Sequence, residues 1–163
     1  MKMEEQERPI VYLKPGELFV SRESAIVSTV LGSCVSVTMF SPELRMGAIC
    51  HALLPVENSS GESFRYVDTS ILSMLEEFGR HGISRTRLEV KLFGGSSMLS
   101  DNAGGYRGVA VGRQNIEKAM QIIEAECLSL VASDLGGTNG RKIYFLTHTG
   151  AVFLKHLGKK WRF

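Results

Sequence analysis

Cys34 and His51 are the two side chains of this sequence whose types and spacing suit joint chemistry. A thiol and an imidazole within reach of each other form a nucleophile and a base, because the imidazole takes the thiol proton and its cation stabilises the thiolate. Cys34 opens the stretch 34–40, and His51 lies near the end of the stretch 45–54. If these stretches pair, the spacing predicts nucleophilic attack by a cysteine on an amide or ester.

Both stretches are predicted to be β-strands, joined by a four-residue loop at 41–44 into an antiparallel hairpin. In that register Phe40 faces Arg45, and Cys34 faces His51 with Cβ atoms about 5 Å apart. The other face of the hairpin is wholly apolar and is predicted to belong to the core. A slip of one residue would separate the thiol from the imidazole, since neighbouring strand residues point to opposite faces.

Two further features surround the predicted pair. A glycine turn at Gly32 aims the backbone N–H groups of Ser33 and Cys34 at one point, where they would hold an oxyanion. A third polar group is needed to fix the tautomer of the imidazole, and Ser28 and Thr29 on the preceding strand are both candidates. Because these two are adjacent and point to opposite faces, only one of them serves.

The same residues have two other interpretations, as unrelated core and surface side chains or as zinc ligands. A cysteine and a histidine in a chain of this length are more often a core residue and a surface residue than a catalytic pair. A zinc site from Cys34, Cys50 and His51 is disfavoured, because the last two are strand neighbours that face opposite ways and no fourth ligand is suitably spaced. No metal or cofactor is therefore predicted, and Cys50 and Cys127 are interpreted as core thiols.

The elements that must position these residues are mostly short strands. Besides the hairpin, strands are predicted at 9–14, 18–21, 25–31, 88–93, 128–132, 143–146 and 151–157. Helical periodicity predicts two helices, at 68–82 and 115–126, with loops at 101–108 and 134–140. Many strands with two sizeable helices indicate a single-domain α+β fold, a layered sandwich of mixed β-sheet.

Composition limits the class of protein further. The 163 residues suit one domain, predicted over 9–163 after a disordered tail at 1–8. With 19 Lys and Arg against 17 Asp and Glu, the net charge of +2 argues against nucleic acid as a partner. Three cysteines without a C-x-x-C pattern, and no apolar run of membrane length, predict a cytoplasmic protein with free thiols and no membrane insertion.

Six short blocks of sequence occur along the chain. Any one of them is a weak signal, but all six in this order are specific. They are Leu31–Val37, Gly47–Pro55, Tyr66–Asp68, Phe93–Met98, Gly112–Asn115 and Asp134–Arg141. Together they resemble the CheD family of chemoreceptor glutamine deamidases, over roughly residues 16–157. The resemblance implies an α/β sandwich similar to that of deamidating bacterial toxins. It also implies a protein-glutamine glutaminase, a cysteine hydrolase that converts receptor glutamine side chains to glutamate and ammonia.

The resemblance also implies roles for individual residues. The family nucleophile matches Cys34 and the family base matches His51, the pair that the hairpin predicts. The family's third residue is a threonine six positions before the cysteine, which is Ser28 here. The implied partners are methyl-accepting chemoreceptors, as substrate, and a CheC-type phosphatase. The alternative is a non-catalytic module that regulates such a phosphatase or receptor.

Overall fold

The computed structural model describes residues 8–56, 63–97 and 105–158, and its side chains from 111 onward in the last range. The tail expected at 1–8 lies outside the described residues except for Arg8, as do positions 101–104 of the first expected loop. The strands are β1 (Ile10–Tyr12), β2 (Leu18–Ser21), β3 (Ile26–Leu31), β4 (Val35–Ser41), β5 (Met46–Cys50), β6 (Glu89–Gly94), β7 (Ser129–Leu135), β8 (Arg141–Leu146) and β9 (Val152–His156). The helices are α1 (Val67–Arg80), α2 (Gly105–Ala125) and a short 3₁₀ turn at Arg85–Arg87.

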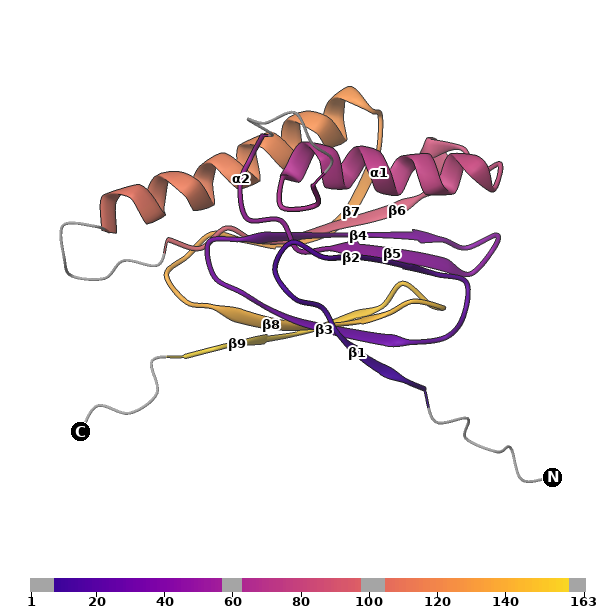
Figure 1. The fold of residues 1–163 in the computed structure, drawn as a ribbon, viewed down its shortest axis with the longest axis horizontal. Coiled ribbons are helices and arrows are strands. Elements are labelled where there is room, and N and C mark those ends of the chain that lie inside the picture. Colours follow the sequence, from indigo (N-terminus) through magenta and orange to yellow (C-terminus); the bar gives the residue numbers. More distant parts are fainter. Residues whose placement is uncertain (1–7, 57–62, 98–104, 159–163) are drawn as a thin grey trace.

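The described strands form two sheets stacked face to face. A five-stranded sheet has the order β2-β5-β4-β6-β7, and a four-stranded sheet has the order β1-β3-β8-β9. Both sheets are mixed, since β6 with β7 and β1 with β3 are parallel pairs among antiparallel ones. Helices α1 and α2 cover the outer face of the five-stranded sheet, and the four-stranded sheet covers its inner face (Figure 1). The predicted layered α+β fold with two main helices is confirmed.

The middle layer is buried on both sides, which explains the composition of its central strands. Every residue of β4 and β5 is buried. One side of β4 packs Val35, Val37 and Met39 into the core beneath the helices. The opposite side faces a second core between the two sheets, which contains Ile49 of β5. The face of β4 toward the helices is apolar from Val35 to Met39, whereas its other face carries Ser36, Thr38 and Phe40.

The helices differ from their predicted bounds. Helix α1 ends close to the expected stop, and Gly82 beyond it has a left-handed backbone with φ of 75°. Helix α2 begins at Gly105, so the loop expected at 101–108 is wrong for its last four residues. Gly112 explains part of this difference, because a Cβ there would lie 2.6 Å from the carbonyl oxygen of Ser96. The glycine permits close packing of a helix rather than marking a turn.

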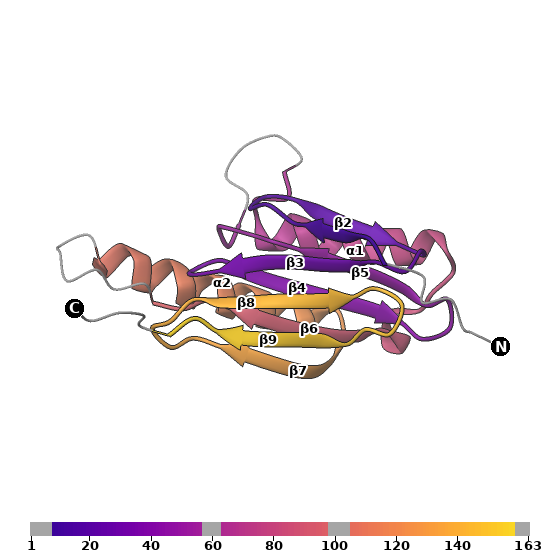
Figure 2. The same cartoon turned by 90° about the horizontal axis from the view of Figure 1, so that it is seen from below.

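Near the C-terminus, one strand is longer than predicted and the closing hairpin is as predicted. β7 continues to Leu135, so Asp134 belongs to a strand and not to the expected loop at 134–140. β8 and β9 form the antiparallel hairpin predicted at the end of the chain. Seen from below, β9 of one sheet lies near β7 of the other, at the same edge of the molecule (Figure 2). None of the described helices is long and apolar enough to cross a membrane.

Candidate active site

The β4–β5 hairpin carries the two residues singled out from the sequence, but in a different register from the predicted one. Ser41 pairs with Met46 and Phe40 pairs with Gly47, so the predicted pairing of Phe40 with Arg45 is wrong by two residues. The reason lies in the loop, which occupies 42–45 because Arg45 adopts a left-handed backbone with φ of 49°. Glycine and asparagine favour that conformation, and an arginine there gives no sequence signal.

A shift of two residues keeps the faces of the strands unchanged. Cys34 is therefore not directly opposite His51, but both lie on the face toward the four-stranded sheet. Cys34 sits in the turn between β3 and β4, half-buried against the core between the sheets. His51 follows β5 and its residue exposure is 2%. Cys34 lies just beyond the last bridge, Val35 with Ala52, and His51 lies just inside it, so the two are diagonal neighbours on that face of the hairpin.

The hydroxyl that contacts His51 belongs to Thr29. Its Oγ1 lies 2.7 Å from His51 Nδ1 and donates to the carbonyl oxygen of Leu13 at 2.8 Å. Since the hydroxyl has one proton, which Leu13 receives, His51 Nδ1 must be the donor to Thr29. The assigned tautomer then leaves His51 Nε2 with a free lone pair, as a general base needs.

Ser28 lies on the other side of β3. Its Oγ is buried and has no hydrogen-bond partner among the described residues. Val27 and Leu31 of the same strand pack into the core between the sheets, so Thr29 shares their face and Ser28 points away from it. The structure thus brings Thr29 to His51 and does not bring Ser28 there. The sequence gives no signal for this choice, because Ile26 and Val30 on the face of Ser28 are as apolar as Val27 and Leu31 on the face of Thr29.

Burial sets the protonation states of the pair at neutral pH. Removal from water lowers the pKa of His51 from 6.5 to about 4. The same effect raises the pKa of the Cys34 thiol, and the backbone N–H of Cys34, which bonds to the sulfur, opposes that rise. The resting site therefore holds a neutral thiol and a neutral imidazole. A thiolate at this site would therefore form by proton transfer to His51, as the sequence analysis expects.

The turn that carries Cys34 is held through its carbonyl groups. Ser96 donates to the carbonyl oxygen of Gly32 from its backbone N–H at 3.0 Å and from its Oγ at 2.8 Å. Gly95 N–H donates to the carbonyl oxygen of Cys34 at 2.8 Å. The backbone N–H groups of Ser33 and Cys34 make no hydrogen bond to any other described residue. Fixed carbonyls leave the N–H of Ser33 available, and that of Cys34 contacts only its own sulfur, which is an arrangement suited to an oxyanion site.

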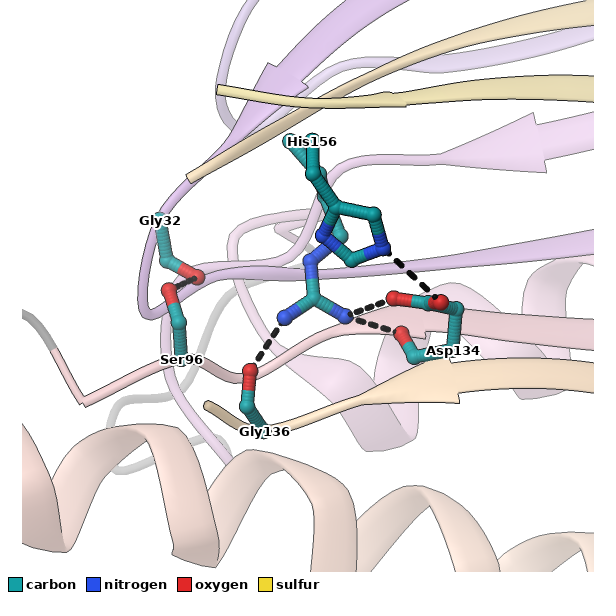
Figure 3. A network of polar contacts seen from close by, with 6 residues as sticks. Gly32, Ser96, Asp134, Gly136 and His156 are labelled. Carbon is teal, nitrogen blue, oxygen red and sulfur yellow. Dashed lines mark hydrogen bonds and ion pairs between the residues drawn. The ribbon is translucent and has the colours of Figure 1, made fainter. Parts of the chain in front are cut away.

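A buried arginine, Arg141, holds the segment at the end of β7, which lies beside the nucleophile turn. Arg141 of β8 is 2% exposed and donates to Asp134 Oδ1 at 2.7 Å and to the carbonyl oxygens of Asp134 and Gly136. His156 Nε2 lies 3.1 Å from the other oxygen of Asp134. Figure 3 shows this cluster beside the contact between Ser96 and Gly32. The glycine-rich segment after β7 is thereby held against the segment after β6, where Ser97 N–H donates to the carbonyl oxygen of Gly137 at 2.8 Å.

The remaining cysteines lie away from the pair. Cys50 is buried in the core beneath the helices, and burial raises its pKa to about 12. Cys127 is exposed at the turn after α2, so its interpretation as a core thiol is wrong. Because Cys50 and His51 face opposite sides of β5, they cannot share a metal ion with Cys34. Within the described ranges no group of three or more potential ligands could hold a metal ion.

Sequence reasoning missed two polar residues that contact the nucleophile turn. Asn115 of α2 is fully buried and donates from Nδ2 to the carbonyl oxygens of Ser33 and Leu53, each at 3.0 Å. Ser96 holds Gly32 as described above. Both residues lie within blocks of the family resemblance, but the helical pattern alone does not separate a buried asparagine from one at a helix terminus.

The fold is a layered α+β sandwich that places a cysteine and a histidine on the same face of one hairpin. A family model described as "CheD chemotactic sensory transduction" matches residues 53–156. A probable chemoreceptor glutamine deamidase CheD 2 of Geobacter sulfurreducens is 52% identical over 151 residues, covering 93% of this chain and 92% of that protein. Proteins named probable chemoreceptor glutamine deamidase CheD from Maridesulfovibrio salexigens and Sulfurimonas denitrificans are 41% and 38% identical, each covering 91% of this chain, and 92% and 94% of their own lengths. The chain belongs to the CheD family.

Proposed function

We propose that this chain deamidates glutamine side chains of chemoreceptors, converting them to glutamate side chains and releasing ammonia. The observation that carries the proposal is the 2.7 Å contact between Thr29 Oγ1 and His51 Nδ1, on the face that also carries Cys34. It orients a buried imidazole so that Nε2 is free to take a thiol proton. The names of the curated relatives support a glutamine of a chemoreceptor as the substrate.

The proposed reaction begins with proton transfer from Cys34 to His51 Nε2, as the sulfur attacks the Cδ carbon of the glutamine. The oxyanion that forms is held by the backbone N–H groups of Ser33 and Cys34. His51 returns the proton to the amide nitrogen, the C–N bond breaks and ammonia leaves, so that a thioester remains. Water then attacks the thioester with His51 as base, which yields glutamate and restores the thiol.

Thr29 serves as the positioning residue for His51 in this scheme, in place of Ser28. The hydroxyl holds the tautomer that has its proton on Nδ1, because its own proton is committed to Leu13. Burial lowers the pKa of His51, so the imidazole is unprotonated at neutral pH and its Nε2 lone pair is available.

Three wider expectations belong to the same proposal. We propose that residues 9–163 act as one catalytic domain and that the protein works in the cytoplasm, where thiols stay reduced. The family resemblance alone supports a CheC-type phosphatase as a binding partner. A pull-down with such a phosphatase tests that partner independently of the catalytic site, using Cys34→Ala as bait.

Mass spectrometry of a chemoreceptor cytoplasmic fragment tests the function directly. After incubation with this protein, defined glutamines are expected to gain about 1 Da each, as amide nitrogen is replaced by oxygen. Heat-unfolded protein serves as the control for spontaneous deamidation. If several receptor fragments stay unchanged while a CheC-type phosphatase is bound, the chain is a regulatory module and the proposed activity is wrong.

A further inference from the structure

Asn115 is a buried side chain of α2 that bridges the two halves of the candidate site. Its exposure is 0%, and its Nδ2 donates at 3.0 Å to Ser33 and at 3.0 Å to Leu53. Ser33 precedes the nucleophile by one residue, and Leu53 follows the base by two. One amide group, supplied by a helix outside the hairpin, therefore contacts the chain on both sides of the Cys34–His51 pair.

These contacts lie beyond the last backbone hydrogen bonds of the hairpin. The β4–β5 ladder ends at the bridge between Val35 and Ala52, and the strands are not paired beyond it. Asn115 joins the two unpaired ends by donating to a carbonyl oxygen of each. Both hydrogens of Nδ2 are used, which fixes the orientation of the amide plane. The side chain thus continues the restraint that backbone hydrogen bonds provide along the rest of the hairpin.

The other restraints on the nucleophile turn act in a different direction. Gly32 and Cys34 are bonded through their carbonyl oxygens to Ser96 and Gly95, which follow β6. Those bonds tie the turn to the β6 side of the sheet, away from β5. Asn115 links the same turn to the segment after His51, which lies on the β5 side. The base segment has its own anchor before β2, because His51 N–H donates to the carbonyl oxygen of Glu17 at 3.1 Å and Gly16 N–H donates to that of His51 at 2.8 Å. Losing Asn115 therefore removes the direct link between the two segments and leaves each one anchored to a different neighbouring strand.

Burying the Asn115 amide also costs free energy, because one of its polar atoms is unpaired within the part of the chain that the structure describes. Asn115 Oδ1 is buried and has no hydrogen-bond partner among the described residues. A buried unpaired oxygen costs about 1–3 kcal/mol, so an apolar residue of similar size would be preferred if the position only filled space. The cost is consistent with a function for the two donated bonds.

We propose that Asn115 is a positioning residue for the deamidation, setting the approach of the Cys34 thiol to the His51 ring through its bonds to Ser33 and Leu53. The inference rests on the proposed function, because it assigns Asn115 to the reaction of that pair. Asn115 does not touch the reacting atoms. It acts on the distance between a nucleophile and a base, to which rates are sensitive at the scale of 1 Å.

A double-mutant cycle of Asn115→Ala and His51→Ala tests the inference. Its readout is the rate at which iodoacetamide alkylates Cys34, measured by peptide mapping. At pH 7, Asn115→Ala is expected to slow alkylation of Cys34 about 10-fold in the chain that has His51, because proton transfer to a displaced base is slower. In the His51→Ala chain the same change is expected to matter by less than about twofold, because no base remains to be positioned. Peptide mapping keeps the exposed Cys127 out of the measurement.

Two further variants separate positioning from folding. Asn115→Leu keeps the branched shape of the side chain and lacks both donors, so it is expected to match Asn115→Ala even if the cavity left by alanine destabilises the fold. Thr147→Ala is the matched control, since Thr147 is buried and bonds to the backbone of Glu23 and Ala25 at the far end of β3. It is expected to lower stability and leave the alkylation rate of Cys34 unchanged.

The outcomes distinguish the two proposals. A loss confined to the chain that has His51, accompanied by a lower kcat at unchanged KM for a receptor fragment, supports the inference. Equal fractional losses with and without His51, or no loss in folded Asn115→Leu, overturn it and leave the catalytic pair intact. If His51→Ala alone leaves alkylation unchanged, the catalytic pair is wrong and the role of Asn115 is overturned with it.

Discussion

In the proposed mechanism, the chemistry depends on one hydrogen bond between Thr29 and the buried imidazole of His51. His51 would be a poor base if its proton sat on the nitrogen facing the nucleophile. Thr29 prevents this because its hydroxyl, committed to Leu13, can only accept from Nδ1. Ser28, one residue earlier, has an equally buried hydroxyl but lies on the opposite face of β3. Both residues have a suitable hydroxyl, so the face of β3 on which each one lies determines which of them contacts His51.

Thr29→Val removes the hydroxyl and keeps the shape of the side chain. Its kcat for a receptor fragment is expected to fall about 10- to 100-fold, because His51 then loses the contact that holds the tautomer of a base. Ser28→Ala is the control and is expected to change kcat by less than about twofold. Thr29→Ser is expected to recover most of the activity. A loss in Ser28→Ala with full activity in Thr29→Val would reverse the assignment.

Burial of His51 also predicts how stability depends on pH. The unfolded chain binds a proton near pH 6.5, whereas the folded His51 stays neutral down to about pH 4. Between these values the unfolded state binds more protons, so the free energy of unfolding falls as pH decreases from 6.5 to 4. The full difference is about 3 kcal/mol. Urea unfolding at pH 7.5 and pH 4.5 measures the fall.

His51→Gln provides the reference for that measurement, because it removes the titrating group and keeps a polar side chain. The variant is expected to lose less stability than the natural chain over the same pH interval. The partly buried His148, whose pKa burial also lowers, contributes with the same sign to both proteins. Parallel pH profiles for the two proteins would show that His51 is not the buried neutral base described here.

At the scale of elements, glycines allow the segment after β6 to reach the nucleophile turn. Gly94 has a left-handed φ of 109°, and a Cβ on it would lie 2.2 Å from the carbonyl oxygen of Cys34. Gly95 has φ of 70° and donates to that same oxygen. The two residues occupy a conformation and a space that other residues cannot share. The close approach places Ser96 where it can hold Gly32.

Gly94→Ala is therefore expected to be severely destabilising. It adds a clash with backbone to the cost of a left-handed alanine, for a loss of at least about 3 kcal/mol. Gly82→Ala is the control, because Gly82 has a φ of 75° with nothing within 4 Å of the added Cβ, and about 1 kcal/mol is expected. Chemical denaturation compares them. Equal losses would mean that backbone conformation, and not contact with Cys34, sets the requirement for glycine.

The sequence predicts the faces of the hairpin better than its register. The alternation of small and large residues in 34–40 assigns Cys34 and His51 to one face, and an error of two residues preserves that assignment. The register itself depends on the left-handed Arg45, which residue preferences do not indicate. Asn115 could not be assigned from its position, because its role follows from contacts with segments far away in the sequence.

At the scale of the whole molecule, the two sheets are joined beside the site by polar groups as well as by their core. Arg141 belongs to the four-stranded sheet, and its partners Asp134 and Gly136 lie at the end of β7 in the five-stranded sheet. Burial lowers the pKa of Arg141, and the Asp134 carboxylate opposes this. The guanidinium thus connects the layers at the edge that carries Cys34. His156 adds a contact to Asp134 from β9 at the surface.

Arg141→Ala is expected to lower the free energy of unfolding by about 3 kcal/mol, since it removes the donors to two part-buried carbonyl oxygens and breaks an ion pair whose cation is buried. His156→Ala is the control, with less than about 1 kcal/mol expected, because that pair is exposed. Urea denaturation at pH 7 measures both. Similar small losses would show that the two sheets are held by their apolar core alone.

The identity of the thiol is the most direct test of the account. We would compare initial rates of deamidation of one receptor fragment by the natural chain, Cys34→Ala and Cys50→Ala, each checked for folding. Cys34→Ala is expected to lose activity by at least about 10³-fold, and Cys50→Ala, which lies beneath the helices, is expected to keep most of it. Retained activity in folded Cys34→Ala would contradict the proposed mechanism, whatever the other variants show.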